Sequence, residues 1–300
     1  MELRQLRSFI KLAETLNFSE AAKELCLTQS TLSQQIKQLE QEFDTMLFIR
    51  NSHGVALSEA GAELLPIARK TVGDADTCRQ RMMDVGNMAI GNLNIGVTYS
   101  FSPIITETIF SFMKRFPGIK LNICYKPMAE LMEMLHHREV DFVLAFKPTM
   151  PMPDIESHTL FQNNLSAIVN SSHVLAKKSS VGMEELARHA LALPSKGLQA
   201  RNTLEHLLER YNYNLNIRIE LNDPHILLDL IRQSNLVTIL AEAAVHNQTG
   251  IKAVPIQIPD NEMTGCVHTL AGSYHKKSMC EFVRMLSESV AVKERANAWL

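Results

Sequence analysis

Residues 18–39 constrain the fold more than any other segment, because they read as two short helices joined by a tight turn. In the second helix, Leu32, Ile36 and Leu39 recur at i, i+4 and i+7, which predicts one apolar stripe that packs inward. Another face carries uncharged hydrogen-bonding or cationic side chains, at Ser30, Ser33, Gln34 and Lys37. Such side chains can reach base edges and phosphates in a DNA major groove, so the segment predicts a helix-turn-helix.

The alternative is a plain helical hairpin whose polar face is only solvated. Two features favour the helix-turn-helix. The polar face lacks the Glu/Lys mixture of a simply soluble helix until Glu40, and the flanking segments supply the other parts of a DNA-binding domain. Ser19 and Thr28 stand where the N-caps of the two helices belong, and Phe18 precedes the first cap as in a hydrophobic staple.

The flanking segments predict a winged domain. An amphipathic helix comes first, with apolar residues at Leu3, Leu6, Ile10 and Ala13. After the second helix, residues 47–50 and 55–57 read as two short strands around a turn at residues 51–54. We expect this hairpin to form a wing that lies over the sugar-phosphate backbone.

A long helix is expected next, with Ser58 as its N-cap. Its apolar residues recur mostly every three or four positions over about seven turns, at Ala60, Leu64, Ala68, Val72, Ala75, Met82 and Val85. A stripe of this length has no domain to pack on nearby, which predicts pairing with the same helix of a second subunit. The alternative is a helix that lies along its own domain. Pro66 predicts a kink or a break near the first turns.

From residue 91 onward, short apolar strands alternate with helices, which predicts parallel sheets with βαβ crossovers. The expected elements of a first unit lie at residues 93–97, 103–116, 119–125, 129–138 and 140–146. Those of a second unit lie at 165–169, 184–188, 190–193, 198–211, 217–221, 226–233 and 237–240, and residues 265–274 and 277–290 return to the first. We therefore divide the chain into residues 1–58, 59–90 and 91–300, with lobe I at 91–162 and 266–300 and lobe II at 163–265.

Composition indicates an ordinary globular protein of 300 residues, with 46% hydrophobic and 21% charged residues. Charges recur throughout the first sixteen residues, so this stretch is no signal peptide, and no run approaches the roughly 20 apolar residues of a membrane span. We expect a cytoplasmic protein without a membrane partner. Five cysteines without a C-x-x-C pair indicate free thiols, at Cys26, Cys78, Cys124, Cys266 and Cys280.

Net charge gives no general reason to bind nucleic acid, since the formal value is −2. Residues 1–90 contain ten Lys or Arg and twelve Asp or Glu, so the proposed DNA-binding part is slightly acidic. Charge alone would not hold such a protein on DNA. Affinity must come from a few placed contacts and from their doubling in a dimer.

At this point the residues resemble the LysR-type transcriptional regulators. The resemblance runs from MELRQLRSFIKLAE through FSEAAKELCLTQSTLSQQIKQLE and LFIR to LSEAG, and beyond residue 61 it rests on strand order and fragments such as EVDFVLA at residues 139–145. It implies a multi-domain α+β chain: an N-terminal winged helix-turn-helix, a long dimerising linker helix and a two-lobed α/β inducer domain similar to periplasmic binding proteins. It also implies dimers, often paired into tetramers, that act on promoter DNA, with RNA polymerase as a further expected partner.

The resemblance also assigns DNA-binding residues by position. The residues that match the family's base-reading positions are Gln29, Ser30, Ser33 and Gln34. Those that match phosphate-holding positions are Thr28, Thr31, Lys37 and Arg50, with His53 at the tip of the wing. Many members carry Pro in place of Ser30, Arg in place of Gln34 and more Arg in the wing, so a relative's base preference does not transfer to this chain.

An effector site is expected where hydroxyl groups follow strands. Ser102 before Pro103 reads as a helix N-cap, and residues 195–197 lie between a strand and a helix of the other lobe. Both places are expected to present hydroxyls and free backbone N–H groups to an anion, at the carboxyl ends of strands where open α/β sheets bind ligands. The resemblance also implies an inducer between the lobes; the alternative is that these serines are simple caps. The candidate effector-binding residues are Thr98, Ser100, Ser102, Lys147, Ser195 and Gly197.

Other functional classes have weaker support. The chain lacks a P-loop and the G-x-G-x-x-G, G-x-S-x-G and H-E-x-x-H motifs, so we expect no enzyme, cofactor or metal site. No cysteine lies between Cys124 and Cys266, which argues against the thiol switch of peroxide-sensing relatives. We predict a sequence-specific transcriptional regulator modulated by a small anionic metabolite. The alternatives are a constitutive DNA-binding regulator and a cytoplasmic solute-binding protein or enzyme with two α/β lobes.

Overall fold

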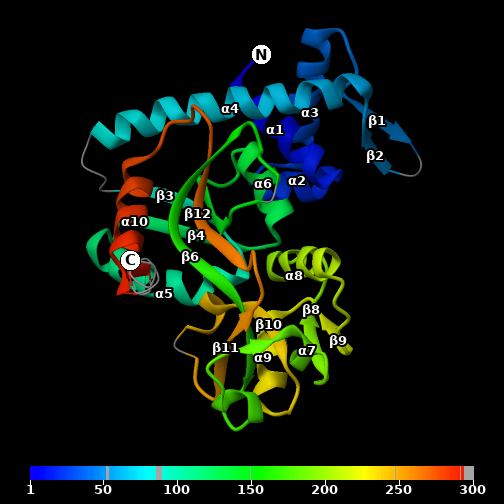
Figure 1. Cartoon of the computed structure of the whole chain (residues 1–300). Helices are drawn as coiled ribbons and strands as arrows, with labels where there is room; N and C mark the ends of the chain where they lie inside the picture. The colour runs from blue at the N-terminus through cyan, green and yellow to red at the C-terminus, as the bar shows by residue number, and fades with distance from the viewer. Residues whose placement is uncertain (52–53, 86–89, 149, 247, 291, 294–300) are drawn as a thin grey trace. The chain divides into compact units, whose positions relative to one another are not determined.

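The computed structural model describes residues 1–51, 54–85, 90–148, 150–246, 248–290 and 292–293. The chain forms two compact units, Met1–Val85 and Gly86–Leu300, each with its own hydrophobic core (Figure 1). Among the described residues, each helix is too short or too polar to cross a lipid bilayer.

The N-terminal unit contains helices around a small hairpin. Its elements are α1 (Leu3–Thr15), α2 (Phe18–Glu24), α3 (Gln29–Phe43), β1 (Phe48–Asn51), β2 (Gly54–Leu57) and α4 (Glu59–Val85). The apolar stripe of α3 is confirmed, because Leu32, Ile36 and Leu39 are all fully buried. Strands β1 and β2 pair antiparallel, with Phe48 opposite Leu57, and form the predicted wing.

One of the two predicted helix caps is confirmed. Thr28 caps α3, since its Oγ1 accepts a hydrogen bond from the Thr31 N–H at 3.1 Å. The prediction for α2 was wrong, because Asn17 and not Ser19 is the cap. The Asn17 Oδ1 accepts from the N–H groups of Ser19 at 2.9 Å and Glu20 at 3.2 Å, and the helix begins at Phe18. Asn ranks with Ser as an N-cap, and here it stands at the position from which both N–H groups can be reached.

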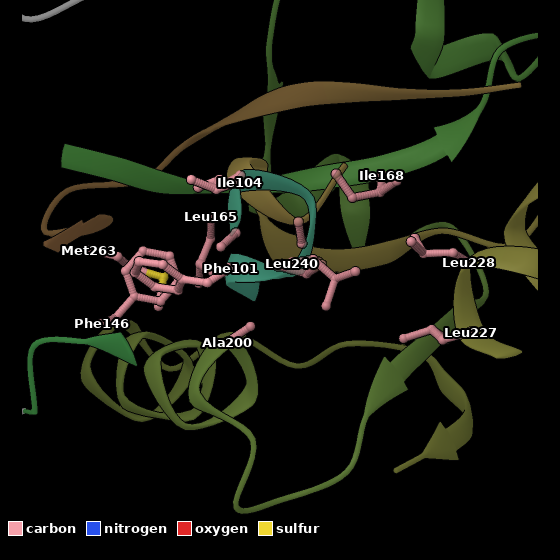
Figure 2. Close-up of a cluster of buried hydrophobic side chains, with 14 of the residues drawn as sticks. Phe101, Ile104, Phe146, Leu165, Ile168, Ala200, Leu227, Leu228, Leu240 and Met263 are labelled. Atoms are coloured by element: carbon pink, nitrogen blue, oxygen red, sulfur yellow. The ribbon is translucent and has the colours of Figure 1, made fainter. Parts of the chain in front are cut away.

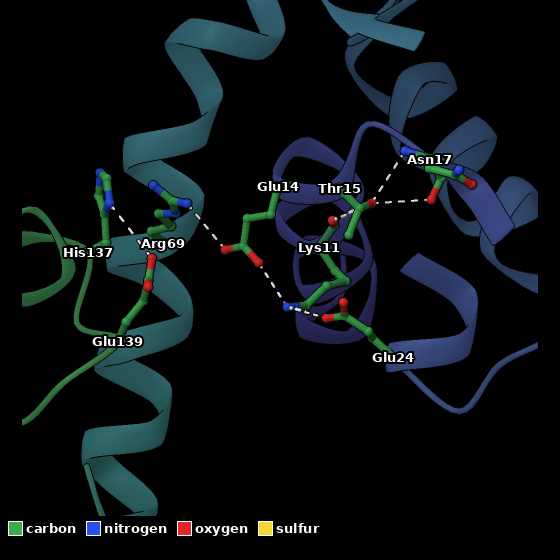
Figure 3. Close-up of polar contacts among 8 residues, drawn as sticks. All are labelled: Lys11, Glu14, Thr15, Asn17, Glu24, Arg69, His137 and Glu139. Carbon is green, nitrogen blue, oxygen red and sulfur yellow. Dashed lines mark hydrogen bonds and ion pairs between the residues drawn. The ribbon is translucent and has the colours of Figure 1, made fainter. Parts of the chain in front are cut away.

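Ion pairs link α1 to its neighbours (Figure 3). The Lys11 ammonium lies 2.9 Å from a Glu14 carboxylate oxygen and 3.0 Å from one of Glu24, and the hydrogen bond to Glu14 raises the pKa of Lys11. The Arg69 guanidinium of α4 reaches Glu14 at 3.2 Å, with its side chain only 14% exposed. These contacts join α1 to both α2 and α4, so they help to fix the helices that carry α3.

Helix α4 packs partly on its own unit. Ala68 and Val72 are buried, at 1% and 8% exposure, in the core that α1 also enters. The prediction that the stripe lacks a partner in its own domain was therefore wrong for this part, whereas Met82 is 71% exposed and Ile67 is 61% exposed. Of the kink or break predicted at Pro66, a break is excluded, since α4 continues through this residue. Pro66 lies on an exposed face, where water can serve the carbonyl that loses its donor.

The start of α4 is fixed against the hairpin. The Ser58 Oγ accepts from the Gly61 N–H at 3.0 Å and donates to the Met46 carbonyl at 2.6 Å, so the predicted Ser58 cap is confirmed. A Cβ at Gly61 would collide with the carbonyl of Leu47. The glycine thus lets the helix approach the hairpin closely.

The C-terminal unit alternates strands and helices. Its elements are β3 (Gly91–Val97), η1 (Tyr99–Phe101), α5 (Ser102–Arg115), β4 (Ile119–Tyr125), α6 (Met128–His136), β5 (Phe142–Phe146), β6 (Ile155–Asn170), η2 (Val174–Lys177), β7 (Val181–Gly182), α7 (Met183–Leu186), β8 (Leu191–Pro194), α8 (Gln199–Tyr211), β9 (Ile217–Leu221), α9 (Pro224–Arg232), β10 (Thr238–Ala241), η3 (Glu242–Val245), β11 (Ile251–Gln257), β12 (Glu262–Leu270) and α10 (Lys277–Glu288).

The long strand β6 takes part in both halves of this unit. The main sheet has the order β4-β3-β5-β12-β6-β11-β7, with β10 also on β6. β3 is parallel to β4 and β5, whereas β6 pairs antiparallel with β12 over residues 155–164 and with β10 and β11 beyond. A strand was predicted at residues 165–169, and its predicted start was wrong, because β6 already begins at Ile155. The first half of β6 is mostly exposed, so it lacks the apolar run of a buried strand.

Two further strands were not predicted. β11 contains Pro255, and a proline inside an apolar run argues against a strand. β7 has only two residues, too few for a pattern. Strands β8 and β9 pair in parallel, and Leu191 of β8 also bridges to Val237 beside β10.

The core of this unit is continuous across its two lobes (Figure 2). Phe101 and Phe146 bring their rings to 5.3 Å of each other, and Phe161 lies 5.4 Å from Phe101. Ala200 of α8 and Leu240 of β10 belong to the same buried cluster. A winged helix-turn-helix, a long helix and a two-lobed α/β domain confirm the predicted fold class.

Candidate DNA-binding surface and effector site

The polar face of α3 is open to solvent. Gln29, Ser30, Gln34 and Lys37 are exposed, and Thr31 and Ser33 are half-buried. The opposite side of the helix is fully buried in the core of the unit. Packing therefore holds α3 as a rigid element and leaves its hydrogen-bonding face free.

Hydroxyl groups cluster at the start of α3. The Thr28 Oγ1 shares hydrogen bonds with the Ser30 Oγ at 2.9 Å and the Thr31 Oγ1 at 2.8 Å. The Ser19 Oγ of α2 donates to the Gln29 Oε1 at 3.2 Å. These contacts orient the side chains before any ligand arrives, which lowers the entropic cost of binding.

Arg50 is positioned by two neighbours. Its guanidinium lies 4.5 Å from the centre of the Phe18 ring, and its Nη2 lies 3.9 Å from the Glu40 Oε2. The side chain remains 42% exposed, so it can still approach a phosphate. His53, the other residue expected in the wing, lies outside the described residues.

Glu40 supports the candidate DNA-binding surface, and the sequence pattern missed this role. It is buried, and its Oε1 accepts from the N–H groups of Leu47 at 2.9 Å and Phe48 at 3.2 Å. It therefore joins the end of α3 to the start of the wing. Its place four residues after Ile36 continues the buried stripe of α3, and this spacing could have revealed it.

The first group of candidate effector residues follows β3. Thr98 and Ser100 are buried, and the Thr98 Oγ1 donates to the Leu144 carbonyl at 3.3 Å. Ser102 is half-buried. Its prediction as an N-cap was wrong, because Ser102 already has helical dihedral angles and Phe101 stands at the N-cap position of α5. The hydroxyl of Ser102 is thus not committed to capping α5.

The second group lies between β8 and α8. The prediction of free backbone N–H groups was wrong for two residues here, because Ser195 N–H donates to the Leu221 carbonyl at 2.8 Å and Gly197 N–H donates to the Asn202 Oδ1 at 3.0 Å. Gly197 has φ of +94°, a conformation that favours glycine. Lys147 is exposed directly after β5. Its ammonium supplies the positive charge in the set of candidate effector-binding residues.

Two contacts join the lobes near these residues, and neither was predicted. The carboxamide of Gln199 bonds to both backbone groups of Phe146, at 3.1 Å and 2.8 Å. The Tyr99 ring meets His225 of α9 edge-on at 4.9 Å between centroids. Burial raises the pKa of Tyr99 to about 12, so its hydroxyl stays protonated.

The cysteines of the described chain are free thiols. Cys266 is buried and Cys124 is half-buried, and burial raises the pKa of both thiols. A raised pKa keeps a thiol neutral and poorly reactive.

An exposed polar recognition helix and a two-lobed α/β domain define a DNA-binding regulator with a ligand-binding domain. The family described as "Bacterial regulatory helix-turn-helix protein, lysR family" matches residues 3–62, and "LysR substrate binding domain" matches residues 87–291. The chain belongs to the LysR family of transcriptional regulators.

A relative in sequence agrees with this assignment, and two solved structures share the fold. The HTH-type transcriptional regulator ShiR of Corynebacterium glutamicum is 30% identical over 262 residues, which cover 85% of this chain and 86% of ShiR. Full-length CbnR in complex with its target DNA has a TM-score of 0.64 at 20% identity, covering 99% of this chain and all (100%) of CbnR. The regulatory domain of CcmR from Synechocystis PCC6803, in complex with 2-PG, has a TM-score of 0.59 at 20% identity, covering 66% of this chain and 96% of that domain.

Proposed function

We propose that the exposed face of α3 reads promoter DNA in the major groove and that a small anionic metabolite, bound between the two lobes, modulates this activity. The observation that carries the proposal is the geometry of α3: a free polar face opposite a fully buried apolar stripe. No catalytic step is assigned to the chain.

The DNA contacts divide by chemistry. Base edges are assigned to Gln29, Ser30, Ser33 and Gln34, because amide and hydroxyl groups can donate to and accept from bases. Phosphates are assigned to Thr28, Thr31, Lys37 and Arg50, and also to His53. The solved complex of CbnR with its target DNA supports DNA binding by a chain of this fold.

Selection of binding sites from random DNA tests these roles. Gln29→Ala should change the preferred base at one position and cost about 1–3 kcal/mol there. Lys37→Ala should weaken binding to all sequences alike and lower the salt dependence by about one ion. Lys23→Ala, at an exposed position of α2, is the matched control. An unaltered base preference in Gln29→Ala would count against base reading by α3.

The effector is assigned to the hydroxyls of Thr98, Ser100, Ser102 and Ser195, the Gly197 turn and the Lys147 ammonium. An anion suits this set, because its charge pairs with the ammonium and its oxygens accept from hydroxyls. The complex of CcmR with 2-PG supports a ligand site in a domain of this fold.

Thermal-shift screening of the full chain with metabolites tests the effector site. A responding anion should lose its effect in Ser102→Ala and keep it in Ser111→Ala, an exposed serine farther along α5. A response that is equal in both variants would place the ligand elsewhere.

We also propose a homodimer or homotetramer, and contact with RNA polymerase at the promoter. Domain limits are proposed at residues 1–58, 59–90 and 91–300, with lobes I and II as given above. Self-association is assigned to the part of α4 whose apolar side chains are exposed, at Ile67 and Met82. Doubling the contacts compensates for a DNA-binding unit that is slightly acidic.

A further inference from the structure

The side chain of Gln199 occupies the open edge of β5. Phe146 N–H donates to the Gln199 Oε1 at 3.1 Å, and the Gln199 Nε2 donates to the Phe146 carbonyl at 2.8 Å. The Nε2 also lies 2.7 Å from the Met128 Sδ. One carboxamide thus satisfies both backbone groups of a single residue in another element.

The sheet explains why this edge is available. β3 ends at Val97, opposite Leu144, and the Thr98 N–H donates to the Leu144 carbonyl on this side. Phe146 lies two residues farther along β5, so its N–H and carbonyl point to the same side, beyond the end of β3. On the other side of β5, the Lys147 N–H bonds to Thr264 of β12. Gln199 therefore takes the place of a missing strand.

The same pairing occurs at a purely structural position. Asn261 bonds to the N–H of Leu165 at 3.0 Å and to its carbonyl at 2.9 Å. Both residues are buried, with Asn261 7% and Leu165 1% exposed, so water and ligands cannot compete. Gln199 differs because it is half-buried, its side chain is longer, and it reaches from α8 to a strand of the other lobe.

We propose that the backbone edge of Phe146 is a subsite of the effector-binding site and that Gln199 holds it until a ligand carboxamide takes its place. The inference rests on the proposed ligand-binding function of this domain. A primary carboxamide presents an acceptor and a donor side by side, as Gln199 does. A carboxylate can accept from the Phe146 N–H, but it would direct negative charge at the carbonyl. The subsite therefore selects a neutral amide group, and its displacement of Gln199 releases a link between the lobes.

Replacement of the side chain by a free amide tests this subsite. Gln199→Ala removes a fragment the size of acetamide, so acetamide is the probe and acetate its charged counterpart. The backbone resonance of Phe146 is followed by NMR in the full chain with ¹⁵N-labelled phenylalanine. In Gln199→Ala, exchange of the Phe146 amide should be at least about tenfold faster than in the wild type. Acetamide should shift this resonance saturably and slow the exchange, whereas acetate should do neither.

Two variants provide controls. Gln199→Met keeps the length but loses both the acceptor and the donor, so its Phe146 amide should exchange faster even if Gln199→Ala folds poorly. Asn261→Ala should lose stability without rescue by acetamide, because Asn261 is buried. The proposal is overturned if the Phe146 amide exchanges no faster in Gln199→Met than in the wild type, or if acetate acts as well as acetamide. The experiment contains neither DNA nor a metabolite. Either of these two outcomes would therefore refute the subsite and leave the DNA-binding assignment untouched.

Discussion

Removal of the Glu40 carboxylate should loosen the wing from the recognition helix. Glu40→Leu leaves the N–H groups of Leu47 and Phe48 without an acceptor at positions that are 2% and 1% exposed. Each buried donor without a partner costs about 1–3 kcal/mol, and partial hydration of a displaced wing reduces the sum. We expect a loss of about 2–4 kcal/mol in the stability of the N-terminal unit.

Glu40→Gln is the matched control, since both hydrogen bonds end on the Glu40 Oε1. A glutamine keeps this acceptor and loses only the charge and the 3.9 Å approach to Arg50. Such a half-exposed ion pair contributes at most about 1 kcal/mol. The glutamine variant should therefore stay close to the wild type.

Hydrogen exchange of the peptide covering residues 44–58, together with thermal unfolding, measures both variants. Exchange at the start of β1 should accelerate strongly in Glu40→Leu and little in Glu40→Gln. Affinity for DNA should fall in Glu40→Leu without a change of base preference, because the wing is proposed to contact phosphates and not bases. Equal exchange in Glu40→Leu and the wild type would refute the assigned role of the carboxylate.

Three further outcomes are expected. Burial lowers the pKa of His268, so the unfolded state binds protons more readily than the folded state does. The unfolding free energy should therefore fall as the pH drops below about 6.5. In denaturation measured at several pH values, His268→Gln should flatten this dependence, and an unchanged slope would refute the assignment. Ile67→Glu should shift the chain toward monomers in analytical ultracentrifugation, and an undisturbed oligomer would place the interface elsewhere. Gly265→Ala forces a Cβ to 2.7 Å from the Phe161 ring and should cost about 1–3 kcal/mol, which Phe161→Leu should partly restore; strictly additive losses would contradict this steric account.

Local patterns predicted the N-terminal unit well. The spacing of Leu32, Ile36 and Leu39 identified the buried side of α3, and the hydroxyl of Thr28 identified its start. The prediction of the α2 cap failed because Asn17 and Ser19 are both residues that cap helices well, and only the backbone geometry distinguishes them. The prediction of what α4 packs against failed for a different reason. Periodicity reveals an apolar face of a helix but not the surface that covers this face.

The C-terminal unit depended more on distant contacts. The first half of β6 has few buried side chains, so only its pairing with β12 reveals it as a strand. Gln199 and Phe146 are 53 residues apart, and no sequence pattern signals such a bond. The assignment of residues 195–197 as an anion site assumed free N–H groups, but those of Ser195 and Gly197 donate to Leu221 of β9 and Asn202 of α8.

Guanine N7 protection from methylation on a selected operator tests the DNA-reading role of α3 most directly. The full chain should protect major-groove guanines in two half-sites about one helical turn apart. Gln29→Ala, Ser33→Ala and Gln34→Ala should each lose protection at defined bases, while Lys37→Ala keeps the pattern at lower affinity. A protection pattern that is identical in all three base-contact variants would contradict the insertion of this helix face into the groove.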